Sequence, residues 1–290
     1  MQKASSHYLP RLYKLQYEPQ VRRALDEDLG RAGDITTDAL IPPESRSSAK
    51  IVSRREGCIA GLDIARTTFH LLDENLQWDL TFPDGALVKA GATLATVRGS
   101  TRSVLSGERV ALNFLGRLSG IATETSRMVA SVADYPTRVT CTRKTTPGLR
   151  ALEKYAVRAG GGTNHRFGLD DAVLIKDNHL AAVGSISRAV EQVRGAIGHM
   201  VKVQIEVDTL QQLDEVLECQ VDAVLLDNMA LATLVEAVGR VRGRLITEAS
   251  GGVTPETAPK IAAAGVDLIS VGWLTHSAPA LDVALEIEPS

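Results

Sequence analysis

Residues 201–227 read VKVQIEVDTLQQLDEVLECQVDAVLLD, and this stretch decides the fold class. A short apolar run is followed by a segment with apolar residues at helical spacing, and then by a second apolar run. Two short buried strands that are joined by a crossover helix are typical of a parallel sheet. We therefore interpret residues 201–227 as one strand–helix–strand unit.

The same rhythm extends in both directions along the chain after residue 137. Helical segments separate six short apolar runs, which we interpret as strands at 138–142, 172–176, 201–207, 223–227, 245–250 and 268–272. No Gly-x-Gly-x-x-Gly motif follows the first run, which argues against a dinucleotide-binding fold. Runs this short and apolar favour a (β/α) barrel with fewer than the usual eight units.

The first part of the chain has a different pattern. Residues 47–62 and 76–100 alternate polar and apolar residues between Gly and Pro-Asp-Gly turns, which indicates strands and hairpins. Residues 105–132 then have apolar residues at helical spacing and predict a long amphipathic helix. We interpret this part as a structural sandwich.

The composition excludes several classes of protein. A formal net charge of −3 argues against a nucleic-acid-binding protein, which is usually strongly basic. The most apolar window, residues 260–276, is too short to cross a membrane and contains Asp267. The three cysteines have no Cys-x-x-Cys spacing, which fits reduced thiols and predicts a cytoplasmic protein.

Positive charge concentrates between Arg138 and His179. This segment contains eight Lys and Arg residues against four Asp and Glu residues, in a chain whose net charge is negative. The excess of cations predicts a binding site for an anion.

Polar residues follow the predicted strands at their C-terminal ends, where (β/α) barrels have their active sites. In strand order, these residues are Arg143 and Lys144, then Lys176, then Glu206, then Asp227, then Ser250, Gly251 and Gly252, and finally Gly272. Loops are polar in general, but all six predicted strands end this way. We therefore predict an active site at this end of the sheet.

The last two strand ends suggest a phosphate site. The segments EASGGVTPE, at 248–256, and SVGWLTHS, at 270–277, supply glycines for close approach to a phosphate, and helix starts follow them. Glycines also form ordinary turns, so this hypothesis is less specific than the strand-end pattern.

Glu206 and Asp227 lie on adjacent predicted strands. The pair is compatible with acid–base catalysis, with a metal site or with acceptors for ribose hydroxyls. Zinc is disfavoured because no His or Cys stands at metal-binding spacing, whereas Mg²⁺ held largely by a substrate phosphate fits better. The four cations Arg143, Lys144, Arg166 and Lys176 would surround a second anion, a carboxylate in particular. For His165 a neutral donor and a solvated loop residue both remain open.

These segments resemble the quinolinate phosphoribosyltransferases, and the resemblance covers most of the chain. The segments that carry it are EDLGRAGDITTDALIP (27–42), SGERVALNFLGRLSGIAT (106–123), TRKTTPGLRALEKYAVRAGGGTNHRFGLDDAVLIKDNH (142–179), IEVDT (205–209), VLLDNM (224–229), EASGGV (248–253) and ISVGWLTHS (269–277).

The resemblance implies two domains and a dimer. It places an N-terminal mixed α/β sandwich domain at 1–120, with 275–290 packing back on it, and an incomplete (β/α) barrel as the catalytic domain at 121–274. It also implies a homodimer in which the partner subunit completes the active site, and it does not decide between a dimer and a hexamer.

The resemblance further assigns residues to two substrates. Quinolinate would bind to Arg109 from the partner subunit and to Thr142, Arg143, Lys144, His165, Arg166 and Lys176. Phosphoribosyl pyrophosphate would bind to Lys176, Glu206, Asp227, Ser250, Gly251, Gly252, Ser270, Val271 and Gly272. The catalytic residues would be Lys144, Glu206 and Asp227, and the last two would hold Mg²⁺, partly through water and substrate.

The activity that the resemblance implies is a phosphoribosyl transfer to the nitrogen of quinolinate. The products are nicotinate mononucleotide, pyrophosphate and CO₂, which is a step of NAD synthesis, and the ring itself serves as the electron sink. Three alternatives remain: a related enzyme of the type associated with molybdate transport, a Schiff-base aldolase that uses Lys144 or Lys176, and a regulator that binds phosphoribosyl pyrophosphate without turnover.

Overall fold

The computed structural model describes residues 9–288. Residues 1–8 and 289–290, which belong to the predicted domain 1–120 and the predicted C-terminal segment, lie outside the described residues. The chain forms two compact units: unit 1 contains 9–126, 145–161 and 274–288 of the described chain, and unit 2 contains 127–144 and 162–273. The domain limits at residues 120 and 274 stay predictions.

Unit 1 is built around a four-stranded antiparallel sheet with the strand order β12-β1-β5-β3. These strands span Val283–Ile287, Arg46–Ser53, Thr93–Ser100 and Gln77–Leu80, respectively. The last strand of the chain, β12, therefore pairs with the first, with Leu285 opposite Ile51.

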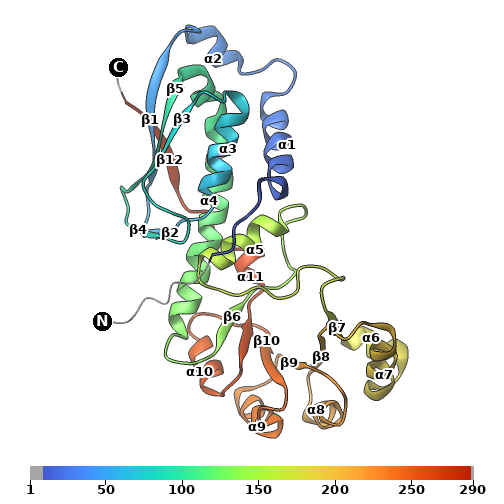
Figure 1. Ribbon diagram of the computed structural model, residues 1–290. Helices are drawn as coiled ribbons and strands as arrows, with labels where there is room; N and C mark the ends of the chain where they lie inside the picture. The colour runs from blue at the N-terminus through green and yellow to red at the C-terminus, as the bar shows by residue number, and fades with distance from the viewer. Residues whose placement is uncertain (1–8, 289–290) are drawn as a thin grey trace. The chain divides into compact units, whose positions relative to one another are not determined.

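Two helices pack on this sheet, α3 (Leu62–Leu72) and α4 (Thr101–Ser131) (Figure 1). Their apolar residues, among them Phe69 and Leu115, form one core with Ile51 and Leu94 of the sheet, and all four are fully buried. The long helix and the antiparallel strands that the sequence predicts in this region are confirmed. The remaining elements of unit 1 are η1 (Lys14–Gln16), α1 (Glu18–Leu29), α2 (Ile35–Leu40), β2 (Gly57–Cys58), β4 (Leu87–Val88), α5 (Arg150–Ala159) and α11 (Trp273–His276), whose first residue belongs to unit 2.

Unit 2 contains a six-stranded sheet with the order β6-β11-β10-β9-β8-β7, and all of its neighbouring strands are parallel. The strands are β6 (Arg138–Thr140), β7 (Val173–Ile175), β8 (Val203–Val207), β9 (Ala223–Asp227), β10 (Ile246–Ser250) and β11 (Leu268–Ser270). The crossover helices are α6 (Asp177–Val183), α7 (Ile186–Ala196), α8 (Leu210–Leu217), α9 (Leu231–Val241) and α10 (Ala258–Ala263) (Figure 1). The sheet ends at β6 and β7 without closing, so the predicted incomplete barrel is confirmed.

Local chemistry explains why the stretch 201–227 forms a strand, a helix and a strand. Val203, Ile205 and Val207 of β8 are all buried, as a strand covered on its outer face by helices requires. Helix α8 begins with a capping box, because the Thr209 hydroxyl accepts from Gln212 N–H and the Gln212 side chain accepts from Thr209 N–H.

Among residues 9–288, no helix is both long enough and apolar enough to span a bilayer.

Asp222, just before β9, joins β8 to helix α7. Its carboxylate accepts hydrogen bonds from Val203 N–H at 2.8 Å, from Arg194 at 2.7 Å and from Lys202 at 2.7 Å. Partial burial opposes its ionisation, but the bonds from Lys202, Val203 and Arg194 outweigh burial and lower the pKa of Asp222 to about 2.

We therefore expect Asp222→Asn to lower the thermal midpoint at pH 7 by a few degrees. Because the pKa is lower in the folded than in the unfolded chain, where it is about 3.9, this stabilisation is complete above that value and is lost as the pH falls toward 2. The difference in thermal midpoint between Asp222→Asn and the wild type, measured by scanning fluorimetry, should become smaller from pH 7 to pH 3. Asp214→Asn, at an exposed partner of Arg240, should have little effect. A difference in thermal midpoint between Asp222→Asn and the wild type that does not change with pH would contradict this role of the Asp222 carboxylate.

Candidate active site

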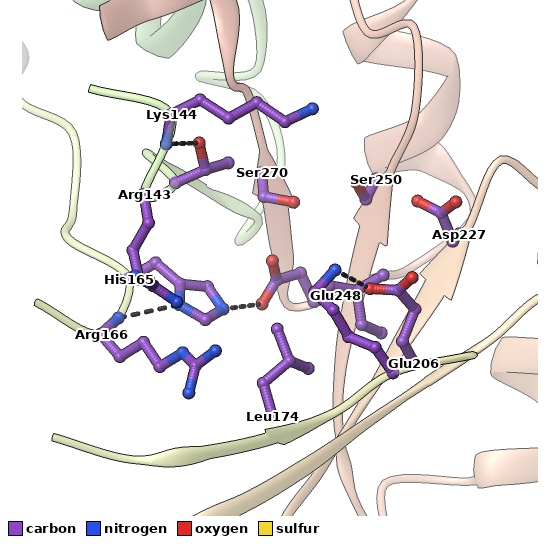
Figure 2. A pocket seen from close by; sticks show the side chains of 13 residues that line it. Arg143, Lys144, His165, Arg166, Leu174, Glu206, Asp227, Glu248, Ser250 and Ser270 are labelled. Carbon is purple, nitrogen blue, oxygen red and sulfur yellow. Dashed lines mark hydrogen bonds and ion pairs between the residues drawn. The ribbon is translucent and has the colours of Figure 1, made fainter. Parts of the chain in front are cut away.

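A cavity of about 510 Å³ opens at the C-terminal ends of the parallel strands in unit 2 (Figure 2). Every strand of the sheet, or the loop that follows it, contributes to its wall. The lining residues are Thr142, Arg143, Lys144, His165, Arg166, Leu174, Lys176, Glu206, Leu225, Asp227, Glu248, Ser250 and Ser270. Six of the strand-end residues that the sequence pattern selects are thus brought together in one cavity: Arg143, Lys144, Lys176, Glu206, Asp227 and Ser250.

One side of the pocket is cationic. Arg143 and Lys144 follow β6, and Arg166 lies in the loop before β7. The Arg166 guanidinium donates from Nη1 to the Ala172 carbonyl at 2.7 Å. Partial burial, and then repulsion from the charge of Arg143, lower the pKa of Arg166. An anion that accepts from both guanidinium groups would relieve this repulsion, and a carboxylate has the matching geometry.

The opposite side of the pocket is acidic. Glu206 lies in β8 and Asp227 is the last residue of β9, so the two carboxylates come from adjacent strands. Lys176, directly after β7, donates to Glu206 Oε2 at 2.5 Å. Among residues 9–288, no three His, Cys, Asp or Glu side chains meet to hold a metal ion. Two carboxylates on adjacent strands are residues that could hold a Mg²⁺ ion if most of its ligands came from substrate and water.

The turns after β10 and β11 carry the predicted phosphate cradle. Ser250 and Ser270 line the cavity, whereas Gly251, Gly252, Val271 and Gly272 follow them and are not among its lining residues in the described chain. Gly251 and Gly252 have φ of +103° and +56°, which favours glycine. A Cβ on Gly251 would come within 2.9 Å of Asn228 Cα, so this turn needs glycine for close backbone approach as well.

Arg109 is the one predicted site residue that belongs to unit 1. It is exposed on α4 and is not among the residues of the described chain that line the cavity. The sequence pattern alone indicates a solvated helix residue at this position, and its assignment to quinolinate stays a prediction.

The structure adds two polar residues that the sequence analysis missed. Glu248 lies inside β10, lines the cavity and is only 1% exposed, and Gln204 lies inside β8 beside it. Side chains two residues apart point to the same face of a strand, so Gln204 precedes Glu206 and Glu248 precedes Ser250 on the face toward the site. This period-two pattern is the signal by which they could have been found.

The floor of the pocket also has an apolar component, since Leu174 of β7 and Leu225 of β9 line it together with the charged groups. Cations, carboxylates and an apolar surface within one cavity suit a flat substrate that carries negative charges. The fold and the pocket together define an α/β enzyme that acts on small anionic molecules.

Comparisons with known proteins identify the family. The chain matches the model of the quinolinate phosphoribosyl transferase N-terminal domain over residues 34–119 and that of the C-terminal domain over residues 121–286. It is 46% identical to a probable nicotinate-nucleotide pyrophosphorylase [carboxylating] of Bacillus subtilis, with 90% of each chain covered. It is 41% identical to quinolinate phosphoribosyltransferase [decarboxylating] 1b of Nicotiana tabacum, over 92% of this chain and 81% of that protein.

Solved structures agree with this result. The nicotinate-nucleotide pyrophosphorylase from Francisella tularensis superposes with a TM-score of 0.92 at 36% identity, and the alignment covers 97% of this chain and 99% of that chain. The chain belongs to the quinolinate phosphoribosyl transferase family. The resemblance that the sequence motifs indicate is therefore confirmed.

Proposed function

We propose that this protein transfers the phosphoribosyl group of phosphoribosyl pyrophosphate to the nitrogen of quinolinate and releases pyrophosphate and CO₂, which yields nicotinate mononucleotide. The observation that carries this proposal is the division of one pocket into a side with two guanidinium groups and a side with two carboxylates beside a lysine. The first side suits a dicarboxylate, and the second suits a sugar pyrophosphate with its hydroxyls and its metal ion.

On the cationic side, Arg143, Lys144 and Arg166 bind the two carboxylates of quinolinate. Forked guanidinium groups bind carboxylates through two parallel hydrogen bonds, so they fix the orientation of the ring as well as its charge. Leu174 and Leu225 offer the ring an apolar surface. Thr142, whose hydroxyl accepts from Lys144 N–H at 3.0 Å, holds the turn that carries these cations.

On the acidic side, phosphoribosyl pyrophosphate lies along the ends of β8 to β11. The turns 250–252 and 270–272 bind its 5-phosphate, Glu206 and Asp227 accept hydrogen bonds from its hydroxyls, and Lys176 faces the pyrophosphate. For Lys176 to do so, its ion pair with Glu206 has to open.

The reaction then follows from the charges. The bond between the anomeric carbon and the pyrophosphate oxygen breaks, and the ring nitrogen supplies the electron pair for the new N–C bond. The pyridinium so formed accepts the electrons of the C2–carboxylate bond, CO₂ leaves, and a proton from solvent replaces it. The residues supply preorganised charge for these steps, which is the main catalytic device of such sites.

Glu206 and Asp227 are the residues that would hold Mg²⁺ in this proposal. The ion supplies charge neutralisation for the departing pyrophosphate when it is bound. Two carboxylates from adjacent strands, without a third protein ligand among the described residues, match the few protein ligands that Mg²⁺ usually takes.

Removal of Mg²⁺ with EDTA is expected to abolish turnover, and added Mg²⁺ should restore it. Asp227→Asn removes one of the two negative charges, so it should raise the Mg²⁺ concentration at half-maximal rate about tenfold, which corresponds to about 1.4 kcal/mol. Titration of the rate against Mg²⁺ measures this. Asp208→Asn, at an exposed acid just beyond β8, is the control that should leave the titration unchanged. An unaltered Mg²⁺ titration for Asp227→Asn would refute the assignment.

Two further parts of the proposal concern assembly and location. The protein acts as a homodimer in which Arg109 reaches the partner's quinolinate, and the exposure of Arg109 outside the lining of the pocket supports this arrangement. It acts in the cytoplasm, and a reducing compartment is supported by Cys58, Cys141 and Cys219, none of which forms a disulfide among the described residues.

The test of the proposed function is one assay with two ring substrates. The protein is incubated with phosphoribosyl pyrophosphate, Mg²⁺ and either quinolinate or nicotinate, and nicotinate mononucleotide and CO₂ are followed together. Product from quinolinate alone, with one CO₂ for each nucleotide, is the expected result. No product from quinolinate, with binding of phosphoribosyl pyrophosphate intact, would contradict the proposal and favour a related enzyme that acts on another ring.

A further inference from the structure

A short hydrogen-bonded chain runs from the backbone of Arg166 into the sheet. The N–H of Arg166 donates to Nδ1 of His165 at 2.8 Å. Because a backbone N–H can only donate, Nδ1 must be the acceptor, and the ring proton is therefore on Nε2. This contact selects the neutral Nε2–H tautomer of His165.

The other ring nitrogen meets two buried polar groups. Nε2 lies 3.0 Å from Gln204 Oε1 and 3.4 Å from Glu248 Oε2, so it donates toward both oxygens. Figure 2 shows the contact between His165 and Glu248. Gln204 in turn donates from Nε2 to Glu248 Oε2 at 2.8 Å. We call His165, Gln204 and Glu248 the brace. Its members come from the loop before β7, from β8 and from β10.

The brace contains a charge that is costly to bury. Glu248 is 1% exposed and Gln204 is 9% exposed. Burial favours the neutral acid, but the hydrogen bonds from His165 and Gln204 outweigh burial and lower the pKa of Glu248. A buried carboxylate is kept only where its hydrogen bonds compensate for lost hydration, so the three groups depend on one another.

The brace holds Arg166, whose guanidinium group is subject to electrostatic repulsion from Arg143. Partial burial, and then repulsion from the charge of Arg143, lower the pKa of the Arg166 guanidinium. Two contacts oppose this repulsion: Nη1 donates to the Ala172 carbonyl, and the backbone N–H donates to His165. The second contact is rigid only if the His165 ring is itself fixed.

We propose that Gln204 and Glu248 are positioning residues for substrate binding. They fix the tautomer and the orientation of the His165 ring, and through Nδ1 they hold the backbone of Arg166, so that its guanidinium is preorganised for the carboxylates of quinolinate. This inference rests on the proposed function for its substrate. It assigns to His165 a role in support of Arg166 that its position in a loop does not reveal.

The kinetic test uses Gln204→Met, which keeps the approximate shape of the side chain and removes both of its hydrogen-bonding groups. The Michaelis constant for quinolinate should rise at least tenfold, while that for phosphoribosyl pyrophosphate stays within twofold. Glu248→Gln retains an oxygen that can accept from both neighbours, so its effect should be several times smaller than that of Glu248→Ala. Equal rises in both Michaelis constants, or none for Gln204→Met, would overturn the proposal.

The matched control is Thr247→Val. Thr247 is the neighbour of Glu248 on β10, is similarly buried at 3% exposure, and directs its hydroxyl to Asp267 instead of the brace. Thr247→Val should lower the stability of the protein but leave the Michaelis constant for quinolinate within twofold of the wild-type value. If Thr247→Val raised the Michaelis constant for quinolinate as much as Gln204→Met, any damage to the sheet would have this effect. The positioning role of Gln204 and Glu248 would then be refuted.

A measurement without turnover separates this inference from the proposed function. Nitrogen NMR of the imidazole rings is practical because the chain has six histidines, and a His165→Asn variant identifies the signals of His165. The wild type should show the neutral Nε2–H pattern at His165, and Gln204→Met should change it. An Nδ1–H tautomer in the wild type would refute the brace even if quinolinate is turned over. If the wild type turns over no quinolinate but shows the expected pattern, the proposed function fails and the hydrogen-bonded chain stands.

Discussion

Arg143→Ala is expected to lower kcat/KM for quinolinate by about two to three orders of magnitude. Loss of one partner from a buried charge pair costs about 3–5 kcal/mol, because the remaining charge is left without compensation, and each 1.4 kcal/mol corresponds to roughly a factor of ten. Arg143 and Arg166 both line the cavity, and partial burial, followed by repulsion from Arg143, lowers the pKa of Arg166. One carboxylate of the substrate would then face a single guanidinium group.

Two further variants sharpen this prediction. Arg143→Lys keeps the charge but not the planar fork, so it should recover only part of the activity. Arg138→Ala, at an exposed position at the other end of β6, should behave as wild type. Steady-state kinetics with both substrates, together with a thermal midpoint close to wild type, make the measurement. Activity of Arg143→Ala within twofold of wild type in a folded protein would contradict the assignment.

Much of unit 2 is predictable because its signals are local. Each strand of the parallel sheet is a short apolar run between helical segments, and the period of the pattern identifies both. The polar residues at the strand ends are predictable for the same reason, since parallel strands bring their C-terminal ends to one edge. Arg143, Lys176, Glu206, Asp227 and Ser250 are found in this way, and the structure places all of them around one cavity.

The interior polar residues are harder to predict because their partners are far away in the sequence. Gln204 lies inside β8 and Glu248 inside β10, and 44 positions separate them. Nothing near either residue indicates the partner that makes its burial tolerable. The open alternative for His165 has the same origin: its contacts with β8 and β10, not its loop, show that the ring is hydrogen-bonded into the sheet and is not a solvated side chain.

Glu153 is an example of the same limit in unit 1. It lies on helix α5 and is completely buried. Its Oε1 accepts from Arg117 of helix α4 at 2.8 Å, and its Oε2 accepts from Thr146 N–H at 3.0 Å. Arg117 also donates to the carbonyls of Thr275 and Ala278. This ion pair joins two helices whose sequences show only ordinary amphipathic patterns.

We expect Arg117→Met to lower the free energy of unfolding by about 3–5 kcal/mol, because it leaves the Glu153 carboxylate buried without its cation. Unfolding in urea, followed by circular dichroism, measures the change. The control is Arg22→Ala, which breaks the exposed pair with Glu18 one turn away on α1 and should cost at most about 0.5 kcal/mol.

The double variant Arg117→Met with Glu153→Met separates the charge from the packing. Replacing both members of a buried pair by apolar residues of similar volume is often neutral, so the double variant should be more stable than Arg117→Met alone. Thr146 N–H and the carbonyls of Thr275 and Ala278 lose a partner in the double variant, which limits the recovery to part of the loss. A double variant less stable than Arg117→Met would show that the contact of Glu153 with Thr146 N–H outweighs the cost of an uncompensated buried charge.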